Sequence, residues 1–463
     1  MAVPRIHPYT PGVRSADTVR RWLGRVPVPR DLEAITTVGP EEGELAAVGM
    51  SAAGREAIWR AVEGLYRTGL HPAIALCVRR GGRVVIDRAI GHARGRSPGA
   101  GHARGRAPGG GHARGRSPGA GAGGVLATPD TPFCLFSASK AHTAVLIHLL
   151  AERGFFRLDD RVADHLPDFG RHGKASITIR QLLTHRAGIP RVPGSREDPS
   201  ILVEPDRALA ALCDARPQSQ PGGPPTYHAL STGYVLAALA KRATGRDLRA
   251  LMRDEILAPA GFALSNYGLS AERVEEVADT VVTGVPLSPP LSSLSTRALG
   301  VTWAEAAALS RDPRFFAHII PSANIVATAN EASRFYQLLL GGGVLDGVPI
   351  LPSAAITAAR RPSSRGRIDR ILLMPVPHGE GFMLGARYLS PFGPGTPQAF
   401  GHVGFMPLFC WADPERDIAV ALLTSGKLIA DTHLVGTVGV LRAIARACPP
   451  TGTRAHATGR GRP

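Results

Sequence analysis

The stretch FCLFSASKAHTAVLIHLLAER, residues 133–153, carries the strongest structural signal in this sequence. It begins as an extended apolar segment and continues as an amphipathic pattern, which predicts a helix that starts near Ser137 and buries Leu149 and Leu150. Residues three positions apart are neighbours on a helix, so the Lys140 amine is expected beside the Ser137 hydroxyl. A serine at a helix start also lies near the positive end of the helix dipole, which favours a developing alkoxide. The stretch therefore indicates a serine nucleophile with a lysine partner.

Lysine is rare in this chain, which makes the spacing of Ser137 and Lys140 informative. Of 54 lysines and arginines, only Lys140, Lys174, Lys241 and Lys427 are lysines. To act as a base, Lys140 needs a pKa well below the roughly 10.4 of a free lysine, and burial can lower it that far. By itself, Ser-x-x-Lys is a weak motif and leaves a purely structural role open.

Strand signals lie at both ends of the chain, and helical patterns fill its middle. HPAIALCVRR and GGRVVIDRAIG predict two strands joined at residues 81–82, after a helical face within residues 51–69. LFCWADPERDIAVALLTS predicts a second hairpin around residues 413–415, and DTHLVGTVGVLRAIARA predicts a closing helix that ends at Cys448. These patterns predict an α+β fold, within the broad α/β class: an antiparallel sheet with flanking helices, completed by both ends of the chain, and an inserted all-helical domain.

The same patterns give the expected boundaries. The main catalytic domain is expected at residues 51–448, with a sheet subdomain at residues 51–90 and 320–448 and a helical subdomain at about residues 137–320. The other predicted segments are an irregular N-terminal extension at residues 1–50, a disordered Arg/Gly repeat insert at residues 92–121 and a disordered tail at residues 449–463.

The formal net charge of +17 first suggests a nucleic-acid partner, so the position of the charge matters. Residues 92–121 hold three copies of a ten-residue unit, HARGRSPGAG, HARGRAPGGG and HARGRSPGAG, with six arginines and no acid. Three more arginines lie in the tail after Cys448, and without these nine the charge is +8. The repeats contain no Phe, Tyr or Trp on which a base could stack. We therefore expect a solvated insert and no specific nucleic-acid partner, with a weak nonspecific polyanion contact as the alternative.

Composition also limits the compartment and the cofactors. The five cysteines are odd in number and scattered, without C-x-x-C spacing, which argues against a disulfide framework or a zinc site and fits a reducing compartment. No apolar run approaches the roughly 20 residues of a transmembrane segment, and the first residues show no signal peptide. A cytoplasmic protein without a cofactor is expected. The oligomeric state is not predicted.

Two further motifs carry residues with useful chemistry. Tyr227-His228-Ala229 lies directly before a helical pattern, and Gly401-His402-Val403-Gly404-Phe405 opens a candidate strand. In isolation, each is more often structural than catalytic. The glycines beside His402, however, permit the close backbone approach that is useful where an amide must donate to an oxyanion.

Together and in this order, the three motifs resemble those of the serine β-lactamase and penicillin-binding protein superfamily. More narrowly, the chain is similar to the class C β-lactamase-like esterases, some of which are called lipases. The resemblance covers roughly residues 51–448 and includes non-catalytic stretches such as ITIRQLLTHRAGIP and PSANIVATANEASRFYQLLLGGGVLDG. It implies a β-lactamase/transpeptidase-like fold and a serine hydrolase that acts on a small-molecule carboxylic ester through an acyl-enzyme.

The resemblance also implies a role for each matching residue. Ser137 would be the acylated nucleophile, Lys140 its proton acceptor or relay, and Tyr227 the group that passes the proton to the leaving group. His402 and Gly404 would take the ends of the family's K-T-G element, here in an H-x-G form. The oxyanion hole would be formed by the backbone N–H groups of Ser137 and Phe405.

Two departures from the family pattern bear on the substrate. Ala229 replaces the asparagine of Y-x-N, whose side chain contacts the amide of β-lactams, and His402 replaces the lysine of K-T-G, which weakens the fixed positive charge for a substrate carboxylate. Both changes favour a neutral ester over a β-lactam. The open alternatives are a β-lactamase, a DD-peptidase-type amide hydrolase, a non-catalytic relative and a polyanion-binding protein. A Ser-His-Asp hydrolase is disfavoured because the chain has no G-x-S-x-G motif.

Overall fold

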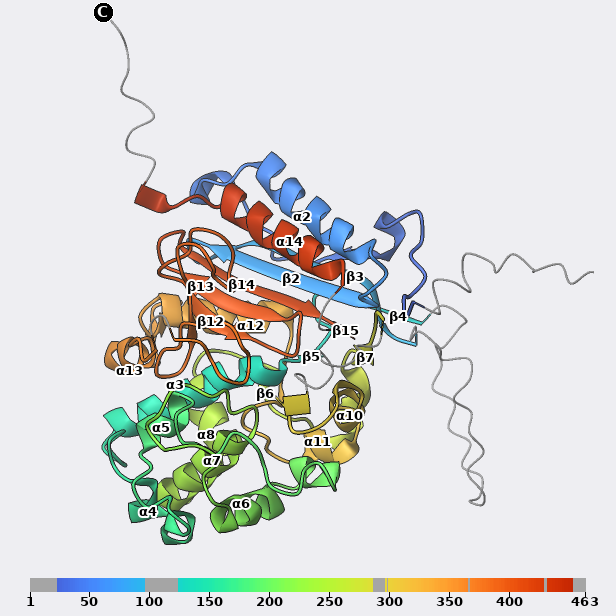
Figure 1. Ribbon diagram of the computed structural model, residues 1–463. Helices are drawn as coiled ribbons and strands as arrows, with labels where there is room; N and C mark the ends of the chain where they lie inside the picture. Colours follow the sequence, from blue (N-terminus) through green and yellow to red (C-terminus); the bar gives the residue numbers. More distant parts are fainter. Residues whose placement is uncertain are drawn as a thin grey trace, which may run out of the picture.

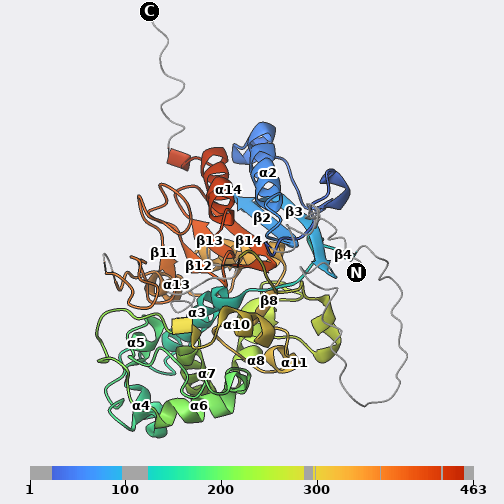
Figure 2. The same ribbon diagram turned by 45° about the vertical axis from the view of Figure 1, so that its right-hand side comes forward.

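The computed structural model describes residues 23–95, 124–285, 296–297, 299–364, 367–428 and 431–452. In these residues, an antiparallel sheet lies between two helices on one side and a larger group of helices on the other (Figure 1). Figure 2 shows the same layers after a turn of 45°. The predicted α+β fold, an antiparallel sheet with flanking helices, is therefore confirmed.

Helices α2 (Ala52–Tyr66) and α14 (His433–Ala447) pack together on one face of the sheet (Figure 1). The Ser51 side chain caps the start of α2 by accepting a hydrogen bond from the Gly54 backbone N–H at 3.0 Å. Buried apolar residues recur along one face of α2, among them Ile58. The predicted first and closing helices thus form one layer.

Two hairpins from opposite ends of the chain make the centre of the sheet. Strands β2 (Ala73–Arg80) and β3 (Arg83–Arg94) are joined at residues 81–82, two glycines with φ of 55° and 76° that adopt this tight turn without a Cβ penalty. Strands β13 (Phe409–Asp413) and β14 (Ile418–Thr424) form the second hairpin, and β14 pairs with β2. Both predicted hairpins are confirmed, as is their meeting in one sheet.

Alternate residues of β2 face two different cores. Ile74, Leu76 and Val78 belong to the core under α2 and α14, whereas Ala75 and Cys77 face the opposite core. Both sides of the strand are buried, which explains why its sequence is continuously apolar from Ala73 to Val78 rather than alternating.

The sheet has the strand order β1–β3–β2–β14–β13–β12–β11, with β4 paired to β3. Its other members are β1 (Thr36–Val38), β4 (Val125–Leu126), β11 (Met383–Leu384) and β12 (Phe400–Val403). A separate three-stranded sheet consists of β5 (Phe133–Cys134), β8 (Ile325–Ala327) and β6 (Asn266–Tyr267). Two short pairs complete the described strands: β7 (Val281–Val282) with β15 (Gly426–Lys427), and β9 (Val344–Leu345) with β10 (Val348–Pro349).

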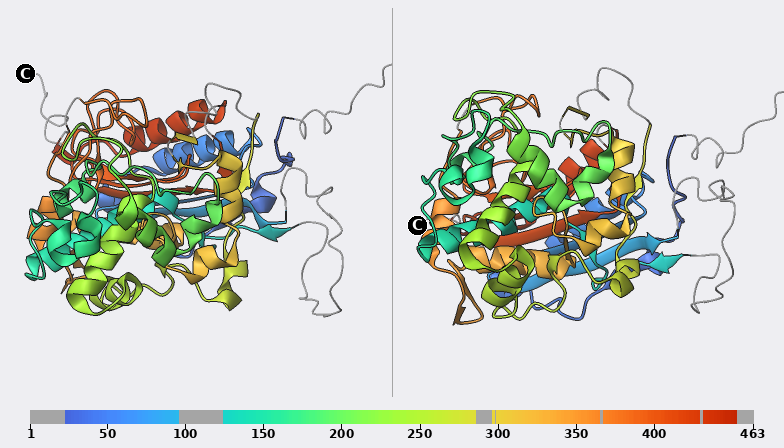
Figure 3. Two further views of the ribbon diagram at one scale, coloured as in Figure 1. Left: turned by 60° about the horizontal axis from the view of Figure 1, so that its bottom comes forward. Right: turned by 90° about the horizontal axis from the view of Figure 1, so that it is seen from below.

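The second face of the sheet is covered by helix α12 (Ala329–Leu340), which contacts β2, β13 and β14. Helix α3 (Ser139–Glu152) contacts β12 and leads into the larger helical group, which Figure 3 shows from below. The helices of this group and of the sheet margin are α4 (Val162–His165), α5 (Ile179–Leu183), α6 (Pro205–Asp214), α7 (Ser231–Thr244), α8 (Leu248–Met252), α10 (Trp303–Leu309), α11 (Pro313–Ala317) and α13 (Ser353–Ala359).

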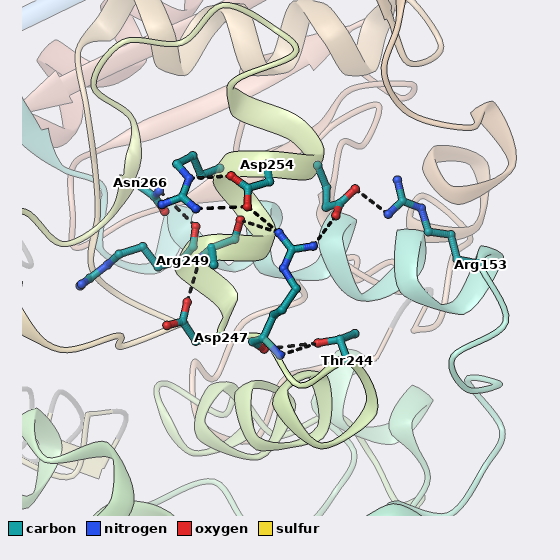
Figure 4. Close-up of polar contacts among 10 residues, drawn as sticks. Arg153, Thr244, Asp247, Arg249, Asp254 and Asn266 are labelled. Atoms are coloured by element: carbon teal, nitrogen blue, oxygen red, sulfur yellow. Dashed lines mark hydrogen bonds and ion pairs between the residues drawn. The ribbon is translucent and has the colours of Figure 1, made fainter.

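An ionic network fastens the far end of α3. Arg153, just past α3, donates to Glu255 at 2.6 Å, and Arg246 bonds to Glu255 and Asp254, also at 2.6 Å (Figure 4). Each surface ion pair contributes little alone, but here two arginines share one carboxylate in a connected network. The network ties α3, which carries Lys140, to the segment that follows α8.

Two boundaries differ from the sequence prediction. Residues 36–38, predicted to belong to an irregular extension, form strand β1 and pair with β3. Residues 92–94, predicted to begin the repeat insert, form the end of β3, where His92 pairs with Leu126. The rest of the insert lies outside the described residues, as does the tail beyond residue 452. None of the helices in the described ranges has both the length and the apolar character needed to span a membrane.

Candidate active site

Ser137 lies in a short 3₁₀ turn, Phe136–Ala138, between strand β5 and helix α3. The residue before it, Phe136, has φ of 46°, in the left-handed region that a bulky L-residue rarely adopts. Such backbone strain persists only where the surroundings fix it, and it is concentrated at functional sites. Phe136 is buried, whereas Ser137 is partly exposed, so the turn leaves the serine accessible to solvent beside a buried residue.

The Lys140 amine lies beside that hydroxyl, as the i, i+3 spacing predicts. Its Nζ donates to Ser137 Oγ at 3.0 Å, to the Ala229 carbonyl at 2.6 Å and to the Ser322 carbonyl at 3.2 Å. None of these partners carries a charge that would hold the ammonium form, and burial lowers the pKa of Lys140 to about 7. At neutral pH a large fraction of this amine is therefore free to accept a proton.

Tyr227 completes a group of three side chains. It lies before helix α7, and its ring centroid is 5.1 Å from Lys140 Nζ. Burial raises the pKa of its phenol, and a side-chain hydrogen bond with Ser137 opposes this effect in part. Tyr227 is thus protonated at neutral pH and able to donate. The structure brings Ser137, Lys140 and Tyr227 together.

His402 lies on β12 and is 2% exposed, with Nδ1 2.7 Å from the Val403 carbonyl oxygen. Burial, assisted by the charge of Lys140, lowers its pKa to about 3, so the imidazole is neutral at physiological pH. A lysine at this position could supply a cation, but this histidine does not. The position of Ala229, the other departure from the family pattern, contributes its backbone carbonyl to Lys140 instead of a side chain.

Gly404 allows the loop after β12 to approach the nucleophile turn. A Cβ on Gly404 would lie 2.6 Å from the Leu135 carbonyl oxygen, closer than real Cβ atoms come to any backbone atom. The close approach expected from this glycine is therefore present. It brings Phe405 against the turn, with the Phe405 and Phe136 ring centroids 5.2 Å apart. The predicted oxyanion role of the Ser137 and Phe405 amides stays a prediction.

A cavity of about 30 Å³ adjoins the inner side of the site. Its lining includes Lys140, Ser322, His185, His378 and His402. This volume has room for about two water molecules, and the lining offers the polar partners that ordered water needs. Among the described residues, His, Cys, Asp and Glu side chains form no group of three or more that could hold a metal ion.

Three residues that lie around Tyr227 were not predicted from the sequence: His185, Asp369 and His378. His185 falls in the stretch ITIRQLLTHRAGIP, but periodicity gave it no role. Asp369 and His378 lie in an irregular segment. They come close to Tyr227 only in the folded chain, through tertiary contacts. No local pattern could have identified these two residues.

Comparisons with known proteins show the family of this chain. The family model described as Beta-lactamase matches residues 60–437. The esterase/beta-lactamase LipL of Mycobacterium tuberculosis is 32% identical over 358 residues, covering 72% of this chain and 79% of LipL.

Solved structures share the fold. A penicillin-binding protein homologue from Caulobacter crescentus matches with a TM-score of 0.69 and 28% identity, over 86% of this chain and 99% of that protein. A family VIII carboxylesterase matches with a TM-score of 0.68 and 24% identity, over 86% of this chain and 99% of that chain, and this match shows the fold alone. The chain belongs to the beta-lactamase family, a family of serine hydrolases that has esterase members.

Proposed function

We propose that the protein is a carboxylesterase that forms an acyl-enzyme on Ser137. The observation that carries this proposal is the 3.0 Å hydrogen bond between Ser137 Oγ and a buried Lys140 whose pKa is lowered to about 7. An amine with a pKa near ambient pH is suited to general base catalysis on an adjacent hydroxyl.

In the acylation step, neutral Lys140 takes the proton from Ser137 Oγ while this oxygen forms a bond to the ester carbonyl carbon. The carbonyl electron pair moves onto oxygen, and the backbone N–H groups of Ser137 and Phe405 stabilise the oxyanion. Collapse of the intermediate breaks the bond to the alcohol oxygen, which takes a proton from the Tyr227 hydroxyl. The Lys140 ammonium returns the proton to Tyr227.

Deacylation follows the same path in reverse. A water molecule gives a proton to neutral Lys140 while its oxygen forms a bond to the acyl carbon. Collapse of this intermediate breaks the bond to Ser137 Oγ, which takes a proton from the Tyr227 hydroxyl, and the Lys140 ammonium returns a proton to Tyr227. The step consumes one water molecule and the acyl-enzyme and yields the carboxylic acid and the free enzyme. Neither step uses a cofactor or metal.

A small, neutral ester is the preferred substrate because His402 is uncharged and Ala229 offers no amide. A β-lactam needs partners for its carboxylate and its side-chain amide. Each lost hydrogen bond of this kind costs about 1 to 3 kcal/mol, so two losses lower kcat/KM by a factor on the order of a thousand. The relative LipL is an esterase/beta-lactamase, and its esterase designation supports this choice.

Hydrolysis of a β-lactam amide is the second candidate, because LipL is also designated a beta-lactamase and another relative is a penicillin-binding protein. Both reactions use the same Ser137, Lys140 and Tyr227 geometry. Only the substrate-positioning groups distinguish them.

The test compares kcat/KM for p-nitrophenyl acetate, butyrate and octanoate with that for nitrocefin. We expect turnover of the short esters and much poorer turnover of nitrocefin. The combined variant Ala229→Asn, His402→Lys should reduce the difference between kcat/KM for the short esters and kcat/KM for nitrocefin. Equal or better turnover of nitrocefin by the wild type rejects the ester preference, and no turnover of any substrate by folded protein rejects the enzyme assignment.

A further inference from the structure

Three consecutive backbone amides hold the loop that carries Tyr227. The Thr226 N–H donates to the His185 carbonyl at 2.9 Å, and the His228 N–H donates to His185 Nδ1 at 3.3 Å. Between them, the Tyr227 N–H donates to Asp369 Oδ1 at 3.2 Å. The backbone of Tyr227 is therefore fixed by one residue from each of two distant segments.

Asp369 is a buried carboxylate with backbone donors around one oxygen. Its side chain is 0% exposed, and Oδ1 also accepts from the N–H groups of Ile371 at 2.8 Å and Leu372 at 2.9 Å. Burial alone would raise the pKa of this carboxyl, but the neighbouring His378 imidazole and the hydrogen bonds from the three amides hold it below its ordinary value. Hydrogen bonds to an ionised acceptor are roughly twice as strong as those between neutral groups, so Asp369 holds the Tyr227 backbone N–H firmly.

His378 joins Asp369 to the rings behind Tyr227. Its Nε2 is 3.6 Å from Asp369 Oδ2, and its ring packs edge-on against His185 with centroids 5.2 Å apart. The His185 ring in turn lies 4.9 Å from the Tyr227 ring. His378 and His185 also line the cavity beside Lys140. Tyr227 is thus held at its backbone by a carboxylate and along its ring by His185, against which His378 packs.

We propose that Asp369, with His378 as its partner, is a positioning residue that holds the Tyr227 hydroxyl in place for proton transfer to the leaving group. The inference rests on the proposed function and adds a residue to it. Asp369 touches no reacting atom, and its effect passes through the Tyr227 backbone. A shift of about 1 Å in a catalytic group lowers rates by about 100-fold, so loss of this anchor has a measurable cost.

The leaving group separates this role from a purely structural one. Protonation by Tyr227 matters much for an alkoxide and little for p-nitrophenolate, which departs without help. We define the leaving-group ratio as kcat/KM for p-nitrophenyl butyrate divided by kcat/KM for ethyl butyrate. Removing the proton donor with Tyr227→Phe should raise this ratio.

The experiment measures the ratio in purified, folded variants. Asp369→Ala should lower kcat/KM for ethyl butyrate by about 100-fold and raise the ratio, as Tyr227→Phe does. Asp369→Asn keeps an acceptor oxygen but loses the charge, so it should raise the ratio less than Asp369→Ala. Adding Asp369→Ala to Tyr227→Phe should raise the ratio no further, because both changes remove the same function.

The matched control is Asp413→Asn. Asp413 is also buried, at 0% exposure, and accepts a hydrogen bond from the Glu415 backbone N–H at 3.0 Å. It lies at one end of β13, whereas Phe409, which pairs with Val403 beside the site, lies at the other end. The leaving-group ratio of Asp413→Asn should stay at the wild-type value.

The outcomes are separable. An unchanged ratio in folded Asp369→Ala, or additive effects in the double variant, overturns the inference. If Asp369→Ala does not fold, an unchanged ratio in Asp369→Asn overturns it equally. Failure of the wild type to hydrolyse either ester rejects the proposed function instead.

Discussion

Lys140 Nζ lies 3.0 Å from Ser137 Oγ, and its two other hydrogen bonds go to the backbone carbonyls of Ala229 and Ser322. This set of neutral acceptors orients the amine without stabilising its charge as a carboxylate would. The amine is therefore directed at the hydroxyl and is also easy to deprotonate. A buried lysine paired with an acid would be oriented but would remain an ammonium ion.

The first prediction is a pH profile. Because neutral Lys140 is the form that accepts the serine proton, kcat/KM for p-nitrophenyl butyrate should be low below the Lys140 pKa and rise with pH through about 7. The raised pKa of Tyr227 means that no loss is expected on the alkaline side below pH 10. A profile that falls between pH 6 and 8 would contradict the assignment of Lys140 as the base.

The second prediction is that Lys140→Ala lowers kcat by several orders of magnitude, since an unactivated serine hydroxyl is a poor nucleophile at neutral pH. Lys241→Ala is the matched control, because Lys241 is exposed at the end of α7 and should leave kcat unchanged. Near-normal kcat in Lys140→Ala would transfer the base role to Tyr227.

The third prediction concerns the close approach at Gly404. Gly404→Ala places a Cβ 2.6 Å from the Leu135 carbonyl oxygen, so the loop that carries Phe405 must move away from the Ser137 turn. Removing one oxyanion donor costs about 100- to 1,000-fold in kcat, and a displaced donor should approach that loss.

Gly439→Ala is the control for Gly404→Ala. Gly439 lies within α14, and a Cβ there meets no atom within 4 Å. Alanine favours a helix by about 1 kcal/mol over glycine, so thermal stability should hold or rise and activity should not change. Equal kcat in both variants would exclude the predicted role of the Phe405 amide.

The fourth prediction concerns the arginine-rich repeat. A Cβ on Gly95 would lie 3.2 Å from Gly124 Cα, so the chain leaves and re-enters the body at one place. Deletion of residues 97–122 should therefore preserve ester hydrolysis and melting temperature, because the repeat has no large apolar side chain to bury. Deletion from residue 92 should lower the melting temperature, because it removes the pairing of His92 with Leu126. Loss of activity in the shorter deletion would show that the repeat takes part in the site.

The local parts of the fold could be predicted because their patterns are local. The two glycines at residues 81–82 specify one turn, and the apolar stripe of α2 specifies one helix face. Strand β1 could not be predicted, since three residues at a sheet edge carry no recognisable period. The β5–β8–β6 sheet joins residues that lie far apart in the sequence, such as Phe133 with Ala327 and Asn266 with Val326, and single-segment patterns do not encode such pairing.

The site was predictable to a similar extent. Helical spacing predicts Ser137 beside Lys140, and the family resemblance adds Tyr227, His402, Gly404 and Phe405. Asp369 carries no signal of its own, because a carboxylate in an irregular segment becomes informative only when the fold buries it beneath the amide of a distant tyrosine. The neutrality of His402 likewise depends on its burial in the folded chain.

The most direct test of the central claim is a mass spectrum of the protein quenched in acid during turnover of p-nitrophenyl butyrate. We predict one butyryl group on the peptide that contains Ser137 and none on this peptide in Ser137→Ala. A butyryl group on another residue, or turnover that persists in Ser137→Ala, would contradict the claim that Ser137 is the nucleophile.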